Sequence, residues 1–320
     1  MTSDLAFLFA GQGAQTVGMG QDLYAEYPAV QALYDRADAA VPFDLKRISF
    51  EGPEEELRRT DVSQPAIVVH SLAALEALKT ELGGELPGVA SAAGLSLGEY
   101  SALCFAGALS LEDTLRLVIA RGVYMQACCE AEPSGMVSLL GLDVDQLGPA
   151  IEAGSALGVV GIANDNAPGQ VVLSGAEAAL QKAAEVAKEL GAKRAVPLNV
   201  AGAYHSQLMA PAGEKLAADL AQAALQGPQV PVIANVDAQP HPQDPDAIRQ
   251  ALVRQVSSTV RFRESLDRMF QGGVTRCFEF GPGGVLKGLV RRVDRKKSCV
   301  AVATVEQVRE AAEALRQEAR

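Results

Sequence analysis

The chain has no tryptophan and only three histidines among its 320 residues. Aromatic side chains are few (6 Tyr and 9 Phe), so it lacks the stacking surfaces of single-stranded nucleic-acid binders. Lys and Arg (28) are outnumbered by Asp and Glu (39), which gives a net charge of −11. This shortage of positive charge argues against nucleic acid or an anionic membrane as the main partner.

Cysteine is also scarce, and the five residues include no C-x-x-C pair. An odd count without that spacing predicts reduced thiols and neither a disulfide framework nor a metal site. No apolar run is long enough to span a bilayer, and the first residues lack the basic segment of a signal peptide. We therefore expect a cytoplasmic protein. The cysteines are Cys104, Cys128, Cys129, Cys277 and Cys299.

Helical and extended patterns alternate along the chain, which is typical of an α/β fold. Leu5–Ala10 and Val89–Leu95 are short apolar runs that end at glycine-containing turns and predict buried strands. Pro65–Leu78 carries a helical apolar pattern. Ser110 begins a capping-box-like sequence that predicts a helix running to about Cys129. Together these features predict a parallel sheet with helices on both faces.

The pattern changes near residue 130, where Glu130–Gly135 has the composition of a turn or linker. The next segment follows the order β-α-β-β-α-β of a ferredoxin-like unit. We predict a small ferredoxin-like subdomain at 130–199, inserted into a large α/β subdomain made of 1–129 and 200–320. Further on, Gln239–Pro245 predicts a surface loop. The small subdomain's expected strands and long helix are Met136–Leu142, Val159–Ala163, Gln170–Ser174, Arg194–Asn199 and Glu177–Leu190.

The sequence Gly94-Leu-Ser-Leu-Gly98 matches the nucleophile elbow G-x-S-x-G. It follows a predicted strand and precedes a predicted helix at Glu99–Ala106, which is the context the motif requires. A sharp strand-to-helix turn exposes the Ser96 hydroxyl beside N–H groups at a helix N-terminus. A glycine-rich turn that merely contains a serine is the alternative.

A nucleophilic serine needs a general base, which is most often histidine. His70 lies in an apolar helical run and is expected to be a core residue, whereas His241 lies between prolines and is expected to be solvated. His205 follows a predicted strand, where α/β sheets place their chemistry, so it is the predicted base.

No third triad member stands out. Asp143, Asp145 and Asp165 precede His205 but fall in the predicted small subdomain. A dyad in which a backbone carbonyl orients His205 is an equal alternative.

Arg121 lies on the apolar face of the helix that follows Ser110, together with Leu117 and Met125. From this pattern alone, two interpretations are equally good. The guanidinium extends to solvent or pairs with a structural carboxylate, or it binds an anionic ligand.

Gly11-Gln-Gly-Ala-Gln15 follows the first predicted strand and resembles a dinucleotide fingerprint. That fingerprint needs a third glycine at position 16, which is Thr16. We therefore expect this loop to lend backbone N–H groups to a neighbouring site and not to bind a nucleotide.

These motifs together resemble the malonyl-CoA:acyl carrier protein transacylases of type II fatty-acid synthesis and the acyltransferase domains of polyketide synthases. The resemblance runs nearly end to end. It rests on segments 11–19, 64–66, 94–102, 121–125, 166–172, 202–206, 251–255 and 279–283, which include Gly11-Gln-Gly, Gly94-Leu-Ser-Leu-Gly98, Gly202-Ala-Tyr-His-Ser206 and Glu279-Phe-Gly-Pro-Gly283.

The resemblance implies an α/β-hydrolase-like large subdomain and a role for each matching residue. Ser96 would be acylated and His205 would be its base, oriented by the backbone carbonyl of Gln255. The N–H groups of Gln12 and Leu97 would form the oxyanion hole. Arg121, with Met125 beside it, would bind the malonyl carboxylate.

Two residues depart from the usual family pattern, because Leu95 replaces a histidine and Ala10 replaces a proline. The first change removes an auxiliary imidazole and the second removes a rigid φ angle. In related domains an aromatic residue before the active-site histidine accompanies malonyl, so Tyr204 favours malonyl over methylmalonyl.

The implied activity is ping-pong transfer of malonyl from malonyl-CoA to the phosphopantetheine thiol of acyl carrier protein, without a bound cofactor. The sequence leaves open whether it serves fatty-acid elongation or polyketide synthesis. Such carriers are acidic, so docking on an acidic enzyme requires a local basic patch; a solvated helix end is the simpler interpretation. A thioesterase and a non-catalytic binding module are the competing functions. The candidate patch is Arg291, Arg292, Arg295, Lys296 and Lys297.

Overall fold

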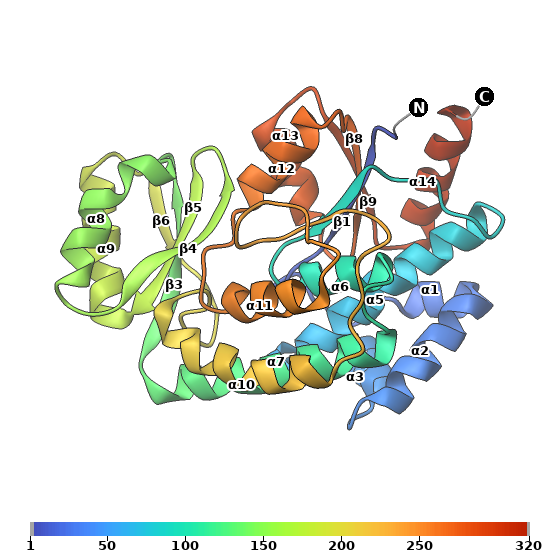
Figure 1. The fold of residues 1–320 in the computed structure, drawn as a ribbon, viewed down its shortest axis with the longest axis horizontal. Helices are drawn as coiled ribbons and strands as arrows, with labels where there is room; N and C mark the ends of the chain where they lie inside the picture. Colours follow the sequence, from blue (N-terminus) through green and yellow to red (C-terminus); the bar gives the residue numbers. More distant parts are fainter. Residues whose placement is uncertain (1–2, 319–320) are drawn as a thin grey trace.

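The structure is a computed structural model that describes residues 3–318. Two sheets organise it, and Figure 1 shows the smaller one at the left of the larger. Sheet A is parallel with the order β7-β2-β1-β8-β9, and sheet B is antiparallel with the order β4-β5-β3-β6. The strands are β1 (Leu5–Phe9), β2 (Ser91–Gly94), β3 (Ser134–Leu140), β4 (Val160–Ala167), β5 (Gln170–Ala176), β6 (Arg194–Pro197), β7 (Val232–Ile233), β8 (Arg276–Phe280) and β9 (Ser298–Val302).

Helices connect the strands of both sheets. Most predicted elements are present with shifted ends, as for the helix predicted at Pro65–Leu78, which begins at Thr60 and ends at Glu81. The α-helices are α1 (Gln21–Glu26), α2 (Pro28–Ala40), α3 (Leu45–Glu51), α4 (Glu54–Arg58), α5 (Thr60–Glu81), α6 (Gly98–Phe105), α7 (Leu111–Ala131), α8 (Gly148–Ser155), α9 (Glu177–Glu189), α10 (Ala210–Gln222), α11 (Pro245–Gln255), α12 (Phe262–Gln271), α13 (Val285–Val293) and α14 (Val305–Glu318).

Both faces of sheet A are buried, as the continuous apolar run of β1 predicts. Alternate side chains of β1 point to opposite faces. Phe7 and Phe9 belong to one apolar cluster, to which α2, α5, α6 and α7 contribute, whereas Ala6 and Leu8 belong to a second cluster with α12 and α13. The sheet is therefore a middle layer between two helical layers, and its carboxyl ends are free to carry polar side chains.

Sheet B has the strand order of a ferredoxin-like unit, in agreement with the predicted β-α-β-β-α-β pattern. One face of sheet B packs against α8 and α9, which lie on the outer side of the sheet in Figure 1. The side chains on this face include Val137, Leu139, Val171 and Leu173. The opposite face contributes side chains such as Met136 to the main cluster of sheet A. The fold class predicted from the sequence is thus confirmed. The division at 129/130 and 199/200 stays a prediction.

The segment predicted as a linker at 130–135 is almost absent. Helix α7 continues to Ala131 and β3 begins at Ser134, so only two residues separate them. The composition of this segment predicts a break correctly but overstates its length, because strand pairing begins within it at Ser134.

A second connection joins the edge of sheet B to the rest of the molecule. The backbone N–H of Asp165 donates to Val260 O at 3.0 Å, and the N–H of Val260 donates to Ala163 O at 2.8 Å. Arg263 also pairs with Asp143 at 3.0 Å. Sheet B is therefore held at β4 as well as by its two chain connections. Among residues 3–318, no helix combines the length and apolar character needed to cross a bilayer.

Candidate active site

Ser96 lies in a sharp turn between β2 and α6 with a φ angle of 54°. This left-handed conformation costs a non-glycine residue on the order of 1–3 kcal/mol. The flanking glycines make the turn possible by close packing. A Cβ on Gly94 would lie 1.9 Å from Gly98 C, and one on Gly98 would lie 2.1 Å from Phe9 O. The G-x-S-x-G spacing is therefore a steric requirement of this turn.

His205 lies directly beside the serine. Its Nε2 is 2.7 Å from Ser96 Oγ, and its Nδ1 is 2.9 Å from the carbonyl oxygen of Gln255. A carbonyl only accepts, so Nδ1 carries the proton and Nε2 is left to accept from the serine hydroxyl. Burial, and secondarily the charge of Arg121, lower the pKa of His205 to about 4. The imidazole is therefore neutral at neutral pH, as a general base must be.

The His205 ring contacts no carboxylate within residues 3–318; its hydrogen-bond partners are Ser96 and Gln255. Asp143 pairs with Arg263, and the Asp165 side chain has an oxygen without a hydrogen-bond partner among these residues. The geometry is that of a serine–histidine dyad oriented by a backbone carbonyl.

Arg121 is 1% exposed, although arginine is normally a surface residue. Its Nη1 donates to Gln64 Oε1 at 2.8 Å, and its Nη2 donates to Ser96 Oγ at 2.8 Å and to Gln255 Oε1 at 3.2 Å. Within residues 3–318, no carboxylate pairs with it and its Nε has no partner. A buried cation without a counter-ion is unfavourable, so this site is suited to an anionic ligand beside the serine.

The loop after β1 lies against the elbow. A Cβ on Gly11 would lie 2.5 Å from Leu95 O, so only glycine allows this approach. Among residues 3–318, the backbone N–H groups of Gln12 and Leu97 donate to no protein acceptor. Both are therefore free to bind an oxygen close to Ser96.

Met125 and Tyr204 are buried near Arg121. Met125 Sδ accepts a long contact of 3.9 Å from Gln64 Nε2. The Tyr204 hydroxyl is 2.9 Å from Thr60 Oγ1, and burial raises the pKa of this phenol to about 12. The Tyr204 phenol is therefore neutral at neutral pH.

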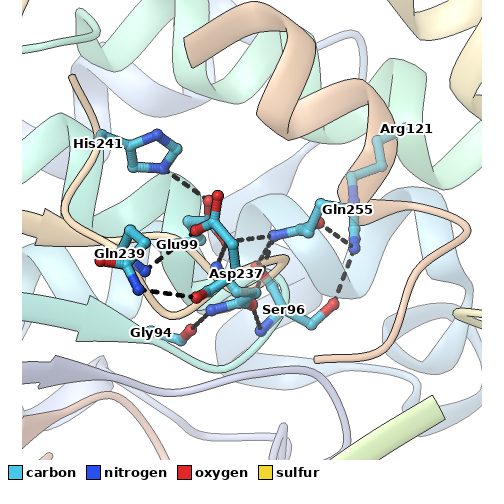
Figure 2. Close-up of polar contacts among 9 residues, drawn as sticks. Gly94, Ser96, Glu99, Arg121, Asp237, Gln239, His241 and Gln255 are labelled. Carbon is cyan, nitrogen blue, oxygen red and sulfur yellow. Dashed lines mark hydrogen bonds and ion pairs between the residues drawn. The ribbon is translucent and has the colours of Figure 1, made fainter. Parts of the chain in front are cut away.

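Sequence reasoning missed the polar residues behind the elbow, and its interpretation of His241 was wrong. His241 is 5% exposed, and its Nε2 is 2.7 Å from Glu99 Oε1, because the proline-rich loop folds back over α6. Figure 2 shows the hydrogen bonds running from His241 through Glu99 and Gln255 to Arg121 and Ser96. The one available signal was Glu99, the single charged residue of a helix that is otherwise uncharged.

His70, the histidine expected in the core, is 1% exposed, and burial lowers its pKa to about 4. Its Nδ1 has no partner within residues 3–318. It lies outside the Ser96 network.

The basic run at the end of α13 lies on the surface. Arg291, Arg292, Arg295 and Lys296 are exposed, and none of them forms an ion pair with another residue of 3–318. Lys297 instead donates to Val274 O at 2.8 Å and lies over the Phe270 ring. The three arginines and Gly288 line a surface hollow. The structure therefore leaves four of the five predicted patch residues free.

Comparison with known proteins agrees with this geometry. A family model described as the acyl transferase domain matches residues 6–317. The malonyl CoA-acyl carrier protein transacylase of Bacillus subtilis is 43% identical over 317 residues, which cover 99% of this chain and 98% of the relative.

Solved structures give the same result. The malonyl CoA-acyl carrier protein transacylase of Clostridium perfringens superimposes with a TM-score of 0.93 and 36% identity, covering 99% of this chain and 98% of that one. A malonyl-transacylase solved in complex with its type II PKS acyl-carrier protein gives a TM-score of 0.92 and 37% identity, covering 98% and 100%. The chain therefore belongs to the acyl transferase family, among the malonyl CoA-acyl carrier protein transacylases.

Proposed function

We propose that this protein transfers malonyl from malonyl-CoA to the phosphopantetheine thiol of an acyl carrier protein through a malonyl ester of Ser96. One observation carries the proposal: Ser96 Oγ lies 2.7 Å from a neutral imidazole and 2.8 Å from a buried guanidinium that has no counter-ion among residues 3–318. A base and a carboxylate receptor thus converge on one hydroxyl.

In the first half-reaction, Ser96 Oγ forms a bond to the thioester carbonyl carbon while its proton passes to His205 Nε2. Gln255 O holds the protonated ring through Nδ1. The tetrahedral intermediate then expels the CoA thiolate, which takes the proton from Nε2. The products are CoA thiol and the malonyl ester.

The intermediate carries negative charge on the former carbonyl oxygen. The N–H groups of Gln12 and Leu97, which have no protein acceptor among residues 3–318, would donate to this oxyanion. Removing one such donor from an oxyanion hole typically costs about 2.7–4 kcal/mol of transition-state stabilisation.

Arg121 binds the free carboxylate of malonyl with two parallel N–H donors. Met125 and Tyr204 close the apolar sides of this site, and their size favours malonyl over a branched homologue. An acetyl group leaves the guanidinium without an anion and is therefore a poor substrate.

In the second half-reaction, the phosphopantetheine thiol attacks the ester and His205 again accepts the proton, which it returns to Ser96 Oγ. The relatives' names associate them with acyl carrier protein. The exposed arginines at and just beyond the end of α13 offer a docking surface for an acidic carrier. Fatty-acid elongation and polyketide synthesis are both compatible with this reaction.

The test is intact mass spectrometry after mixing the protein with malonyl-CoA. A gain of one malonyl group in the wild type that is absent from the Ser96→Ala variant supports the proposal. No adduct with intact malonyl-CoA favours a binding module instead. Consumption of malonyl-CoA without an adduct and without carrier points to a thioesterase.

A further inference from the structure

Asn235, which lies two residues after β7, contacts the nucleophile elbow on both sides of Leu95. Its Oδ1 accepts from the Ser96 N–H at 2.7 Å, and its Nδ2 donates to Gly94 O at 2.8 Å. The side chain is fully buried. One amide group thus satisfies the donor and the acceptor that the sharp turn removes from ordinary strand pairing.

These two hydrogen bonds hold the backbone at a residue with a strained conformation. Ser96 has a φ angle of 54°, a region that non-glycine residues rarely occupy unless their surroundings enforce it. With the Ser96 N–H and the Gly94 carbonyl both held, the peptide planes around Ser96 cannot rotate freely. The direction of its Cα–Cβ bond, and hence the position of Oγ, follows from those planes.

A buried carboxylate holds Asn235 in turn. Glu99 Oε2 accepts from the Asn235 backbone N–H at 3.0 Å and from Gln255 Nε2 at 2.9 Å. Its other oxygen lies 2.7 Å from His241 Nε2. Glu99 is fully buried, and Figure 2 shows its contacts with His241 and Gln255.

The same network reaches the base. Gln255 Nε2 also donates to Ser96 O at 2.9 Å, while Gln255 O accepts from His205 Nδ1 at 2.9 Å. Glu99 therefore links the residue that holds the nucleophile's backbone to the residue that orients the imidazole.

We infer that Asn235 is a positioning residue that clamps the Ser96 backbone so that Oγ lies in line with His205 Nε2. Glu99 supports this clamp, because one of its oxygens bonds to both Asn235 and Gln255 and so fixes their relative position. Asn235 acts through Ser96, so its contribution appears in the rate of serine acylation and not in the binding of malonyl-CoA. This inference rests on the proposed function of Ser96.

The test measures single-turnover acylation of Ser96 by malonyl-CoA in wild type and Asn235→Ala, with thermal unfolding measured in parallel. We expect the maximal acylation rate to fall by about 100-fold, as for small displacements of a reacting group, while half-saturation by malonyl-CoA changes less than about twofold. Gln239→Ala is the matched control, because this exposed side chain in the same loop bonds to Asp237 O and to no other residue of 3–318. It should acylate at the wild-type rate.

A second variant separates positioning from folding. Asn235→Asp keeps the acceptor for the Ser96 N–H but loses the donor to Gly94 O, so its rate should lie between those of wild type and Asn235→Ala. If the alanine variant does not fold, the aspartate variant carries the test.

Two results would overturn the inference. One is a wild-type rate per folded molecule in the substituted proteins, even if their melting temperatures fall. The other is a loss that appears only in half-saturation. A failure of the proposed function itself looks different, because the wild-type protein would then form no malonyl ester.

Discussion

The helix-covered face of sheet B is packed with Val, Leu and Ala, whereas the interior behind the carboxyl end of β2 contains Glu99, Arg121 and Asn235. The backbone shows the same contrast. Between 134 and 197 only glycines have positive φ angles, but Ser96 and His205 both adopt them at the site. The helix-covered face of sheet B follows the usual rules of packing, while the site departs from them and is held by buried hydrogen bonds.

The contrast indicates which property, stability or reaction rate, a substitution in each region should change. Substitutions in sheet B should lower stability and leave the chemistry of each folded molecule unchanged. Substitutions around Ser96 should lower the rate more than the stability. The following predictions test this separation, beginning with the largest expected effect.

Arg121→Ala should reduce acylation by malonyl-CoA by about 100-fold to 1,000-fold, which corresponds to the loss of one partner from a buried ion pair. Acylation by acetyl-CoA should not fall, since acetyl offers no carboxylate. Reactions quenched at timed intervals and analysed by mass spectrometry measure both rates. Arg116→Ala is the control, because this residue of α7 pairs with Asp113 at the surface. Equal rates for wild type and Arg121→Ala with malonyl-CoA would refute the carboxylate role.

Leu173→Ala should lower the free energy of unfolding by about 2–5 kcal/mol, because it leaves a cavity in the apolar face of sheet B. The acylation rate of the folded variant should stay at the wild-type value. Urea unfolding and single-turnover acylation are the two measurements, and Leu157→Ala, at an exposed side chain, is the control. A loss of rate without a loss of stability would contradict the separation of the two regions.

The acid side of the pH profile should report the environment of His205. Its pKa is lowered to about 4, so kcat/KM for acylation should stay nearly constant from pH 7.5 to 5.5 and fall below pH 5. The ordinary pKa of histidine would instead halve the rate near pH 6.5. Circular dichroism at each pH shows whether a fall in rate comes from unfolding or from protonation of His205.

Two buried histidines also contribute to the loss of stability at low pH. The folded pKa values of His70 and His205 lie below the unfolded value, so both stabilise the fold fully above about pH 6.5. That stability is lost as the pH falls from 6.5 toward 4.

Replacing Arg291 and Arg292 together by Glu should raise KM for the carrier protein by about tenfold, as expected for charges at the rim of an interface. Acylation by malonyl-CoA should not change, because among residues 3–318 these exposed side chains form no hydrogen bond or ion pair with the elbow. Arg58→Glu, at an exposed residue of α4, is the control. An unchanged KM would leave the basic run as a solvated helix end.

The parts of the fold that depend on local pattern could be predicted from the sequence. Alternation and turn residues gave the order of sheet B, and the strand–turn–helix context identified the elbow at Ser96. His205 followed from elimination among three histidines. In the first two cases, the information lies within a few neighbouring residues, whereas the choice of His205 compares the surroundings of all three histidines.

The support behind the elbow could not be predicted in this way. Asn235 meets Ser96 across 139 residues of sequence, and His241 meets Glu99 across 142. Neither contact produces a local sequence pattern. The prolines around His241 predict a solvated loop instead of a buried contact. Long-range hydrogen bonds of this kind depend on how the loop after β7 folds over α6, which composition does not determine.

The attachment of β4 to Val260 has a consequence for how the molecule behaves at high concentration. An exposed strand edge is a template for pairing with another chain, and sheet B has two edges. The bridge from Asn164 to Val260 occupies the middle of the β4 edge. The β6 edge ends at Pro197, which has no N–H to offer, and begins at the charged residue Arg194. Each edge therefore offers another chain fewer free backbone hydrogen-bonding groups than a fully open strand would.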